Sequence, residues 1–187
     1  MRIVSGKFKG KKINYLKNNV TRPLKDSVKE NIFNILLHST KLNIDIKNSE
    51  ILDLYSGIGS FGLECISRGA KKVTFVEKDK ISFKILAENL KNLLIRNSYE
   101  IFNTTTESFF KRDFLSRFDI FFLDPPFSNE KFLQDIKLIK KYKLFKKNHL
   151  IIIHRERESK DKFQNILDII FTKTYGRSKI FFATLLE

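Results

Sequence analysis

The stretch Asp53-Leu54-Tyr55-Ser56-Gly57-Ile58-Gly59-Ser60-Phe61-Gly62 decides the fold, because its glycines follow the pattern G-x-G-x-x-G. An apolar run at 50–54, typical of a strand, precedes the loop, and a helical pattern over 60–68 follows it. Glycines at this spacing let the backbone turn tightly and approach a nucleotide closely. The stretch therefore predicts a strand–loop–helix unit that binds a nucleotide-like cofactor.

Outward from this loop, strand and helix patterns alternate along the chain. Strands are predicted at 50–54, 72–77, 99–103, 118–123 and 149–153, and helices at 60–68, 80–94, 106–112, 130–142 and 159–167. The alternation predicts an α/β fold with a doubly wound, mostly parallel sheet. Two more strand-like runs, 169–175 and 179–186, predict a closing antiparallel hairpin and bring the sheet to seven strands. We assign residues 46–187 to this domain.

The first 45 residues form a basic extension ahead of that domain. Alternation of basic and apolar residues over 1–15 predicts a short hairpin, and Ser27 followed by Glu30 predicts a capping box for a helix through about His38. Residues 1–25 contain eight basic residues and no acidic one, whereas the whole chain carries a net charge of +15. A merely lysine-rich composition would not separate the signs in this way, so the extension is expected to contact nucleic acid.

The composition argues against a membrane protein, a secreted protein and a metal-binding protein. No apolar run is long enough to span a bilayer, and the start of the chain does not resemble a signal peptide, which predicts a cytoplasmic protein without a membrane partner. The single cysteine, Cys65, excludes an internal disulfide and a cysteine-based zinc cluster. His38, His149 and His154 lack the spacing of metal ligands, so we expect no metal. A monomer is expected.

Two cofactors suit the glycine loop, a nicotinamide dinucleotide and S-adenosylmethionine. Glu77 ends the second strand, where an acid can accept hydrogen bonds from ribose hydroxyls. A dinucleotide would bring a pyrophosphate dianion close to the carboxylate of Asp53, which would repel it. S-adenosylmethionine has no phosphate and carries a sulfonium and an ammonium group. Asp53 therefore favours S-adenosylmethionine.

The apolar run 118–123 ends in Asp124-Pro125-Pro126-Phe127. The prolines end the strand ladder and make its exit rigid. The exocyclic amine of a nucleobase is a poor nucleophile, because its lone pair is delocalised into the ring. Asp124 and the carbonyl of Pro125 can accept hydrogen bonds from its two N–H groups and so direct the lone pair toward a methyl group. Phe127 offers a flat face on which an extruded base can stack.

These residues resemble known motifs. Asp124-Pro125-Pro126-Phe127 resembles the D-P-P-[FYW] motif of amino-group methyltransferases that act on adenine, cytosine or guanine, and residues 53–62 resemble their cofactor loop. The flanking elements resemble those of the RsmD family of 16S ribosomal RNA guanine-N2 methyltransferases: Arg2-Ile3-Val4-Ser5-Gly6, Gly10, Thr21-Arg22-Pro23, Asp26, Glu30, Phe33 and Tyr175-Gly176-Arg177. The resemblance covers nearly the whole chain.

The resemblance implies a Rossmann-like class I methyltransferase fold, S-adenosylmethionine as cofactor, and 16S rRNA or a small ribosomal subunit particle as partner. The candidate catalytic residues are Asp124, Pro125, Pro126 and Phe127. The candidate cofactor residues are Asp53, Tyr55, Ser56, Gly57, Gly59, Glu77, Lys78 and Thr105, and Thr105 stands where the family usually has an acid or an amide. The candidate RNA-binding residues are Arg2, Lys7, Lys9, Lys11, Lys12, Arg22 and Lys25.

Three alternatives remain open at this point. A DNA or RNA adenine-N6 or cytosine-N4 methyltransferase would share the catalytic loop, although a DNA enzyme normally carries a larger base-recognition domain. A nicotinamide-dependent oxidoreductase would need a proton-relay residue that the sequence does not reveal. A non-catalytic RNA-binding assembly factor would have no use for a carboxylate at position 124.

Overall fold

The structure is a computed structural model that describes residues 1–15, 24–113, 116–126, 131–163 and 165–186. Seven strands form one sheet in the order β3-β2-β1-β4-β5-β7-β6. They are β1 (Glu50–Leu54), β2 (Lys72–Glu77), β3 (Tyr99–Asn103), β4 (Phe118–Leu123), β5 (Phe145–Glu156), β6 (Leu167–Tyr175) and β7 (Ser178–Leu185). The helices are α1 (Asp26–His38), α2 (Ser60–Ser67), α3 (Lys80–Asn92), α4 (Thr106–Phe110) and α5 (Phe132–Lys141). None of the helices in the described ranges is long and apolar enough to cross a membrane.

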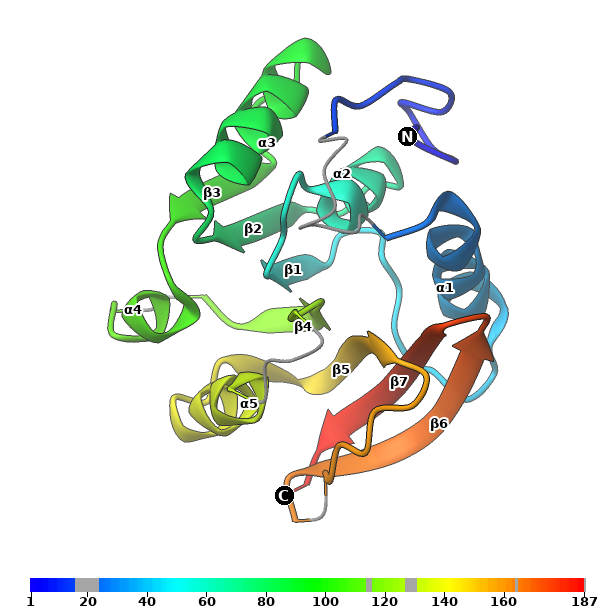
Figure 1. Cartoon of the computed structure of the whole chain (residues 1–187), viewed down its shortest axis with the longest axis vertical. Helices are drawn as coiled ribbons and strands as arrows, with labels where there is room; N and C mark the ends of the chain where they lie inside the picture. Colours follow the sequence, from blue (N-terminus) through cyan, green and yellow to red (C-terminus); the bar gives the residue numbers. More distant parts are fainter. Residues whose placement is uncertain (16–23, 114–115, 127–130, 164, 187) are drawn as a thin grey trace.

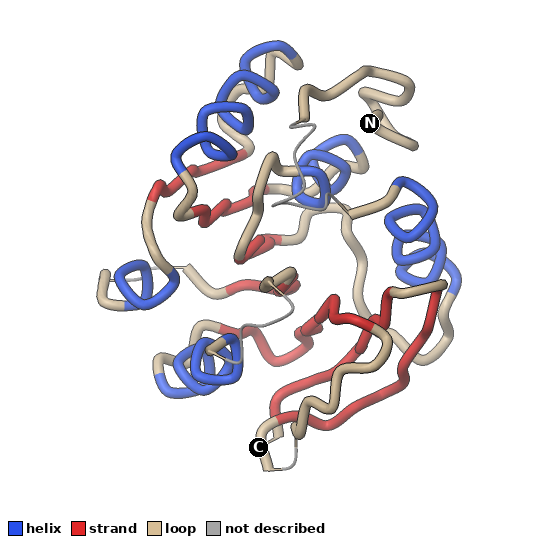
Figure 2. Tube along the Cα trace, viewed as in Figure 1, coloured by secondary structure: helices blue, strands red, loops and turns tan. Residues whose placement is uncertain are grey.

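The sheet confirms the predicted doubly wound topology. Strands β3, β2, β1, β4 and β5 pair in parallel, whereas β7 pairs antiparallel with both β5 and β6. Side chains that alternate along the strands face two separate cores. Helices α1, α2 and α3 lie on one side of the sheet, and α4 and α5 lie on the other (Figures 1 and 2). On β1, Ile51 packs in the core with α1, α2 and α3, whereas Leu52 packs in the core with α4 and α5.

The helix predicted at 159–167 is wrong. The described residues of this segment form turns and irregular chain, and β6 begins at Leu167. Phe163 and Leu167 have helical spacing, but both are buried against the sheet as the chain crosses from β5 to β6. The side chain of Arg155 on β5 also holds the crossing segment, through a buried ion pair of 2.9 Å with Asp161. Tertiary contacts, rather than local periodicity, therefore fix this segment.

The amino-terminal extension differs from its prediction in two details. The hairpin contains a single antiparallel bridge, between Arg2 and Lys12, instead of two strands. The capping box is also wrong, because α1 begins at Asp26 with Lys25 at its N-cap and no side-chain cap bond. Ser27 therefore lies inside the first turn, where Asp26 supplies the negative charge that favours a helix amino terminus.

Buried polar groups fasten the extension to α2. The carboxylate of Glu64 is fully buried and accepts hydrogen bonds from the backbone N–H groups of Val4 (2.7 Å) and Ser5 (2.9 Å). Arg68 pairs with the same carboxylate at 2.9 Å, and the ammonium of Lys29 lies 3.8 Å from it. Apolar residues of the extension share the core of the catalytic domain: Ile3, Ile13, Leu24, Val28 and Phe33. The extension thus packs as part of the same body.

Close packing between α2 and β2 makes Gly62 sensitive to substitution. A Cβ atom at this position would lie 2.2 Å from Phe75 Cε1 and 2.8 Å from Val73 Cγ1. Phe75 is fully buried, so it has little room to move. We expect Gly62→Ala to lower the free energy of unfolding by about 1–3 kcal/mol, the usual cost of overpacking a core. Urea denaturation measures this, and an unchanged midpoint would contradict the expected clash.

Candidate functional site

The candidate site lies where β1 and β4 run side by side. The chain leaves β1 toward α2 and β2 on one side, and leaves β4 toward α5 and β5 on the other. Open α/β sheets bind ligands at such a switch point, at the carboxyl ends of the strands. The two loops predicted to be functional meet there, because the N–H of Asp124 lies 3.4 Å from the carbonyl oxygen of Leu54.

Two carboxylates form hydrogen bonds with backbone N–H groups of the glycine loop. Glu77 accepts hydrogen bonds from the backbone N–H groups of Gly57 and Asp79, both at 2.7 Å. Asp53 Oδ2 accepts one from Gly62 N at 3.0 Å. The loop between them turns through left-handed backbone at Tyr55 and at Gly57, with φ of 61° and 55°. Both acids therefore shape the loop as well as giving it negative charge.

Unpaired buried oxygens gather in this loop. Asp53 Oδ1, Ser56 Oγ and Ser60 Oγ are buried and have no hydrogen-bond partner within the described chain. An unpaired buried polar atom costs about 1–3 kcal/mol, so three in one loop need a reason. A polar ligand that donates hydrogen bonds to them would remove this cost. Ser60 was not among the residues predicted from sequence.

The electrostatics of the site favour a cation. The pKa of Asp53 is raised well above its usual value, chiefly by burial and also by the nearby charges of Asp124 and Glu77, although the Gly62 N–H opposes the shift. Burial likewise raises the pKa of Glu77, against the hydrogen bonds from Asp79 and Gly57. Because Asp53 is repelled by two other carboxylates, a positively charged ligand would stabilise its ionised form, whereas a pyrophosphate would be repelled.

The candidate catalytic loop, which follows β4, is held by residues of β5. The side chain of Asp124 is 23% exposed, and its Oδ1 lies 2.8 Å from Nδ1 of His154. Arg155 donates from Nη1 to the carbonyl oxygen of Pro126 at 3.2 Å. Pro125 is buried and Pro126 exposed, whereas Phe127 lies outside the described residues. The loop therefore presents a partly exposed carboxylate on a fixed backbone.

The remaining cofactor candidates border the same edge. The Tyr55 hydroxyl donates to Asp135 Oδ2 on α5 at 2.5 Å, and burial raises the pKa of this carboxyl. Thr105 is the N-cap of α4, and its hydroxyl oxygen accepts a hydrogen bond from Ser108 N at 3.2 Å. Lys78 is exposed directly after Glu77.

Sequence reasoning missed the residues that support the loops. His154, Arg155, Ser178 and Asp135 come from β5, β7 and α5 and form no motif in the sequence. The one available signal was the position of His154, which ends an apolar run next to the catalytic strand. Such neighbours become visible only when the order of the strands is known.

The predicted RNA-binding residues form an exposed group on the extension. The exposed members are Arg2, Lys7, Lys9, Lys11, Lys12 and Lys25, and Arg22 lies outside the described residues. The backbone beneath them is fixed, since Lys7 N donates to Ser67 O at 2.7 Å and Phe8 N donates to Ser67 Oγ at 2.9 Å. The segment therefore holds its backbone on α2 while its positive side chains face solvent.

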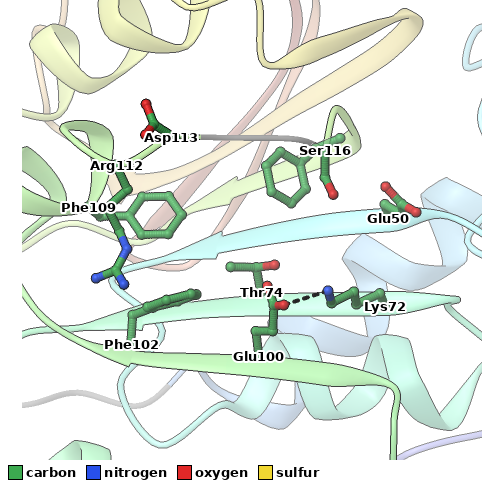
Figure 3. A pocket seen from close by; sticks show the side chains of 10 residues that line it. Glu50, Lys72, Thr74, Glu100, Phe102, Phe109, Arg112, Asp113 and Ser116 are labelled. Carbon is green, nitrogen blue, oxygen red and sulfur yellow. Dashed lines mark hydrogen bonds and ion pairs between the residues drawn. The ribbon is translucent and has the colours of Figure 1, made fainter.

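A cavity of about 410 Å³ lies at the opposite edge of the sheet (Figure 3). Residues that line it include Glu50, Lys72 and Phe118, at the amino ends of their strands. Lys72 forms an ion pair of 2.7 Å with Glu100 there, drawn as a dashed line. Parallel α/β sheets bind ligands at the carboxyl ends of their strands, so this cavity is not the candidate site. No group of three or more possible metal ligands occurs in the described parts of the chain.

The chain is similar over most of its length to known proteins. The family model described as "Conserved hypothetical protein 95" matches residues 1–184. The ribosomal RNA small subunit methyltransferase D of Haemophilus influenzae is 38% identical over 160 residues, which cover 84% of this chain and 80% of the relative. The protein of the same name from Buchnera aphidicola (subsp. Acyrthosiphon pisum) is 36% identical over 83% of this chain and 78% of its own.

Among solved structures, yhhF from Escherichia coli superimposes with a TM-score of 0.83. It is 26% identical and covers 99% of this chain and 97% of its own. The match of fold therefore extends over the extension and the closing hairpin as well as over the central sheet. By the family model and by these relatives, the chain belongs to the Conserved hypothetical protein 95 family, the RsmD family that its motifs resemble.

Proposed function

We propose that this chain transfers a methyl group from S-adenosylmethionine to the exocyclic N2 amine of a guanine in 16S ribosomal RNA. Its relatives are named as ribosomal RNA small subunit methyltransferases, which supports an rRNA methyltransferase. The observation that carries the proposal is the position of Asp124, beside the cofactor loop at the switch point of the sheet. The finer choice of guanine N2 rests on the family resemblance.

S-adenosylmethionine fits the loop. The unpaired oxygens of Asp53, Ser56 and Ser60 are hydrogen-bond acceptors, and the three carboxylates of the site suit its positive charges. Glu77 lies at the end of β2 with Oε2 bonded to Gly57 N of the loop and Oε1 to Asp79 N, and we assign to it the role of accepting hydrogen bonds from the ribose hydroxyls. When bound, S-adenosylmethionine supplies a methyl group on a positively charged sulfur.

The chain then has to orient the amine. Asp124 accepts a hydrogen bond from one N–H of the guanine amine, and the carbonyl of Pro125 accepts a hydrogen bond from the other. These two bonds direct the nitrogen lone pair at the methyl group. The rigid proline backbone lets this arrangement exist before the substrate arrives, which lowers the cost of reaching the transition state. Phe127 offers a stacking face to the base.

Mapping of methylated nucleotides tests the proposal. The 16S RNA of cells with and without the protein is digested and analysed by mass spectrometry, and we expect one N2-methylguanine to disappear with the protein. If N6-methyladenine or N4-methylcytosine disappears instead, the target is the amine of adenine or cytosine and not guanine N2. An unchanged map would contradict the proposal. Methyl transfer by the purified protein is then compared between free 16S RNA and small subunit particles, and this comparison identifies the form of the substrate.

Glu77→Ala is expected to weaken S-adenosylmethionine binding by about 1.5–3 kcal/mol, the range for hydrogen bonds to a charged group. The substitution removes the ribose acceptor and also releases the N–H groups of Gly57 and Asp79. Isothermal titration calorimetry measures the dissociation constant. Glu88→Ala, an exposed position on α3, is the control. An unchanged dissociation constant for Glu77→Ala would exclude Glu77 from the cofactor site.

Cofactor affinity is expected to rise with pH through Asp53. Burial raises the pKa of Asp53 from its usual 3.8, so the ionised form destabilises the free protein, increasingly as the pH rises from 3.8 through the raised pKa. A cationic ligand favours the ionised form, so binding within that window releases a proton. Calorimetry in buffers of different ionisation enthalpy measures the release. In Asp53→Asn we expect less release, weaker binding and a flatter dependence of stability on pH; equal release would contradict the assignment.

A further inference from the structure

A chain of hydrogen bonds runs from the closing hairpin to the catalytic carboxylate. Asp124 Oδ1 lies 2.8 Å from His154 Nδ1, and His154 Nε2 lies 2.9 Å from Ser178 Oγ. The imidazole is nearly buried, with 8% of the side chain exposed, against 23% for Asp124. The methyl transfer proposed above assigns roles to Asp124 and its loop and leaves His154 and Ser178 without one.

The sheet topology brings these three residues together. Strand β5 pairs in parallel with β4, with Ile153 opposite Leu123, so His154 follows at the same edge as Asp124. Strand β7 pairs antiparallel with β5, with Ser178 opposite Glu156, so the first residue of β7 returns to this edge. The start of β7 thus contacts His154, and Figure 1 shows β7 beside β5, where it extends the sheet.

The partner at Nδ1 determines that this ring nitrogen of His154 carries a hydrogen. An ionised carboxylate can only accept, so Nδ1 must carry a hydrogen to bond Asp124. A neutral imidazole then has its lone pair on Nε2, which accepts from the hydroxyl of Ser178. The Nδ1–H tautomer therefore satisfies both bonds at once.

The contact with His154 also gives the two carboxylate oxygens of Asp124 different surroundings. Oδ1 is occupied by His154, whereas Oδ2 accepts no hydrogen bond from any residue that the structure describes. A second contact holds the other end of the loop, since the buried Arg155 donates to the Pro126 carbonyl oxygen and its guanidinium lies 4.6 Å from the ring centre of Phe132. Consecutive residues of β5 thus hold both ends of residues 124–126.

We propose that His154 is a positioning residue, which fixes the Asp124 carboxylate so that Oδ2 faces the substrate amine, and that Ser178 fixes the tautomer of His154. The proposal rests on the function proposed above. A carboxylate held in advance needs no reorganisation during the reaction, and a misplacement of about 1 Å can cost about 100-fold in rate. His154 itself touches neither the substrate nor the cofactor.

Substitutions at 154 separate positioning from packing. His154→Phe keeps a planar aromatic ring and removes the donor, and we expect it to lower kcat about 10- to 100-fold. The dissociation constant of S-adenosylmethionine and the KM for RNA should stay within about twofold. His154→Asn keeps a side-chain N–H near the place of Nδ1 and should recover most of the lost kcat. Ser178→Ala should lower kcat less than His154→Phe. His38→Phe, at an exposed position, is the control.

Nitrogen-15 NMR of the imidazoles gives a readout independent of methyl transfer. In the free protein we expect the His154 signals, assigned by their loss in His154→Phe, to show a hydrogen on Nδ1, and to shift in Asp124→Ala and in Ser178→Ala. An Nε2–H tautomer, or signals unmoved by Asp124→Ala, would overturn the proposal whatever the substrate proves to be. So would an unchanged kcat in His154→Phe, or a loss that His154→Asn does not reduce. Failure of the wild-type protein to methylate 16S RNA would instead count against the proposed function.

Discussion

Asp124→Ala is expected to reduce methyl transfer to the background level, a loss of at least about two to three orders of magnitude, while leaving S-adenosylmethionine binding nearly intact. The side chain of Asp124 is partly exposed at the end of β4, and its Oδ1 is already held by His154. Its remaining oxygen is the proposed acceptor for the guanine amine. The loss should therefore fall on kcat with RNA, measured by transfer of a labelled methyl group.

A matched control is available at the other edge of the sheet. Asp113 is an exposed acid beside the cavity at the amino ends of the strands, so Asp113→Ala should keep wild-type transfer. Removal of Asp124 also removes one of the charges that raise the pKa of Asp53, so a small change in cofactor affinity is expected. If Asp124→Ala weakened cofactor binding by as large a factor as it slowed methyl transfer, Asp124 would belong to the cofactor site instead.

The central sheet was predictable because its signals are local. The strands β1 to β4 have the predicted bounds, since each is a short apolar run next to a turn or helix pattern. The glycine loop and residues 124–126 also lie as expected, because the carboxyl ends of parallel strands share one edge. These loops resemble those of amino-group methyltransferases in general, whereas the resemblance to the RsmD family rested on the flanking elements, among them residues 2–6 and 175–177.

The errors arose where distant contacts replace local patterns. Phe163 and Leu167 suggested a helix, but the sheet buries them as the chain crosses between strands. Ser27 and Glu30 suggested a capping box, but α1 begins at Asp26, where Lys29 reaches the carbonyl oxygen of Arg2 at 2.8 Å. Periodicity and spacing could not reveal either contact.

The supporting residues of the site were hidden for a related reason. His154 meets Asp124 across 30 positions and Ser178 across 24. Glu64 reaches the backbone of Val4 across 60 positions. Such pairs depend on strand order and on the packing of the extension. The sequence pointed to the proposed reacting groups, whereas the structure adds the residues that contact them.

Replacing Lys7, Lys9, Lys11 and Lys12 with Gln is expected to weaken RNA binding and reduce its dependence on salt, without changing cofactor affinity. All four side chains are exposed on the extension. Hydrogen bonds from Lys7 and Phe8 to Ser67 hold the segment to α2 through the backbone, and these bonds survive a change of side chain. The variant should therefore fold normally and lose only positive charge.

The salt dependence distinguishes phosphate contacts from a merely solvated face. Each lost phosphate contact should flatten the plot of log affinity against log salt concentration by about 0.7–0.9, because fewer counterions are released when RNA binds. The control replaces four exposed lysines on α5 and at the start of β5, Lys137, Lys141, Lys143 and Lys147, which changes the net charge equally. If RNA contacts the extension, the first variant should flatten the slope more than the control. Equal slopes for both variants would mean that net charge alone attracts RNA, and a slope unchanged from the wild type would remove the extension from the RNA-binding surface.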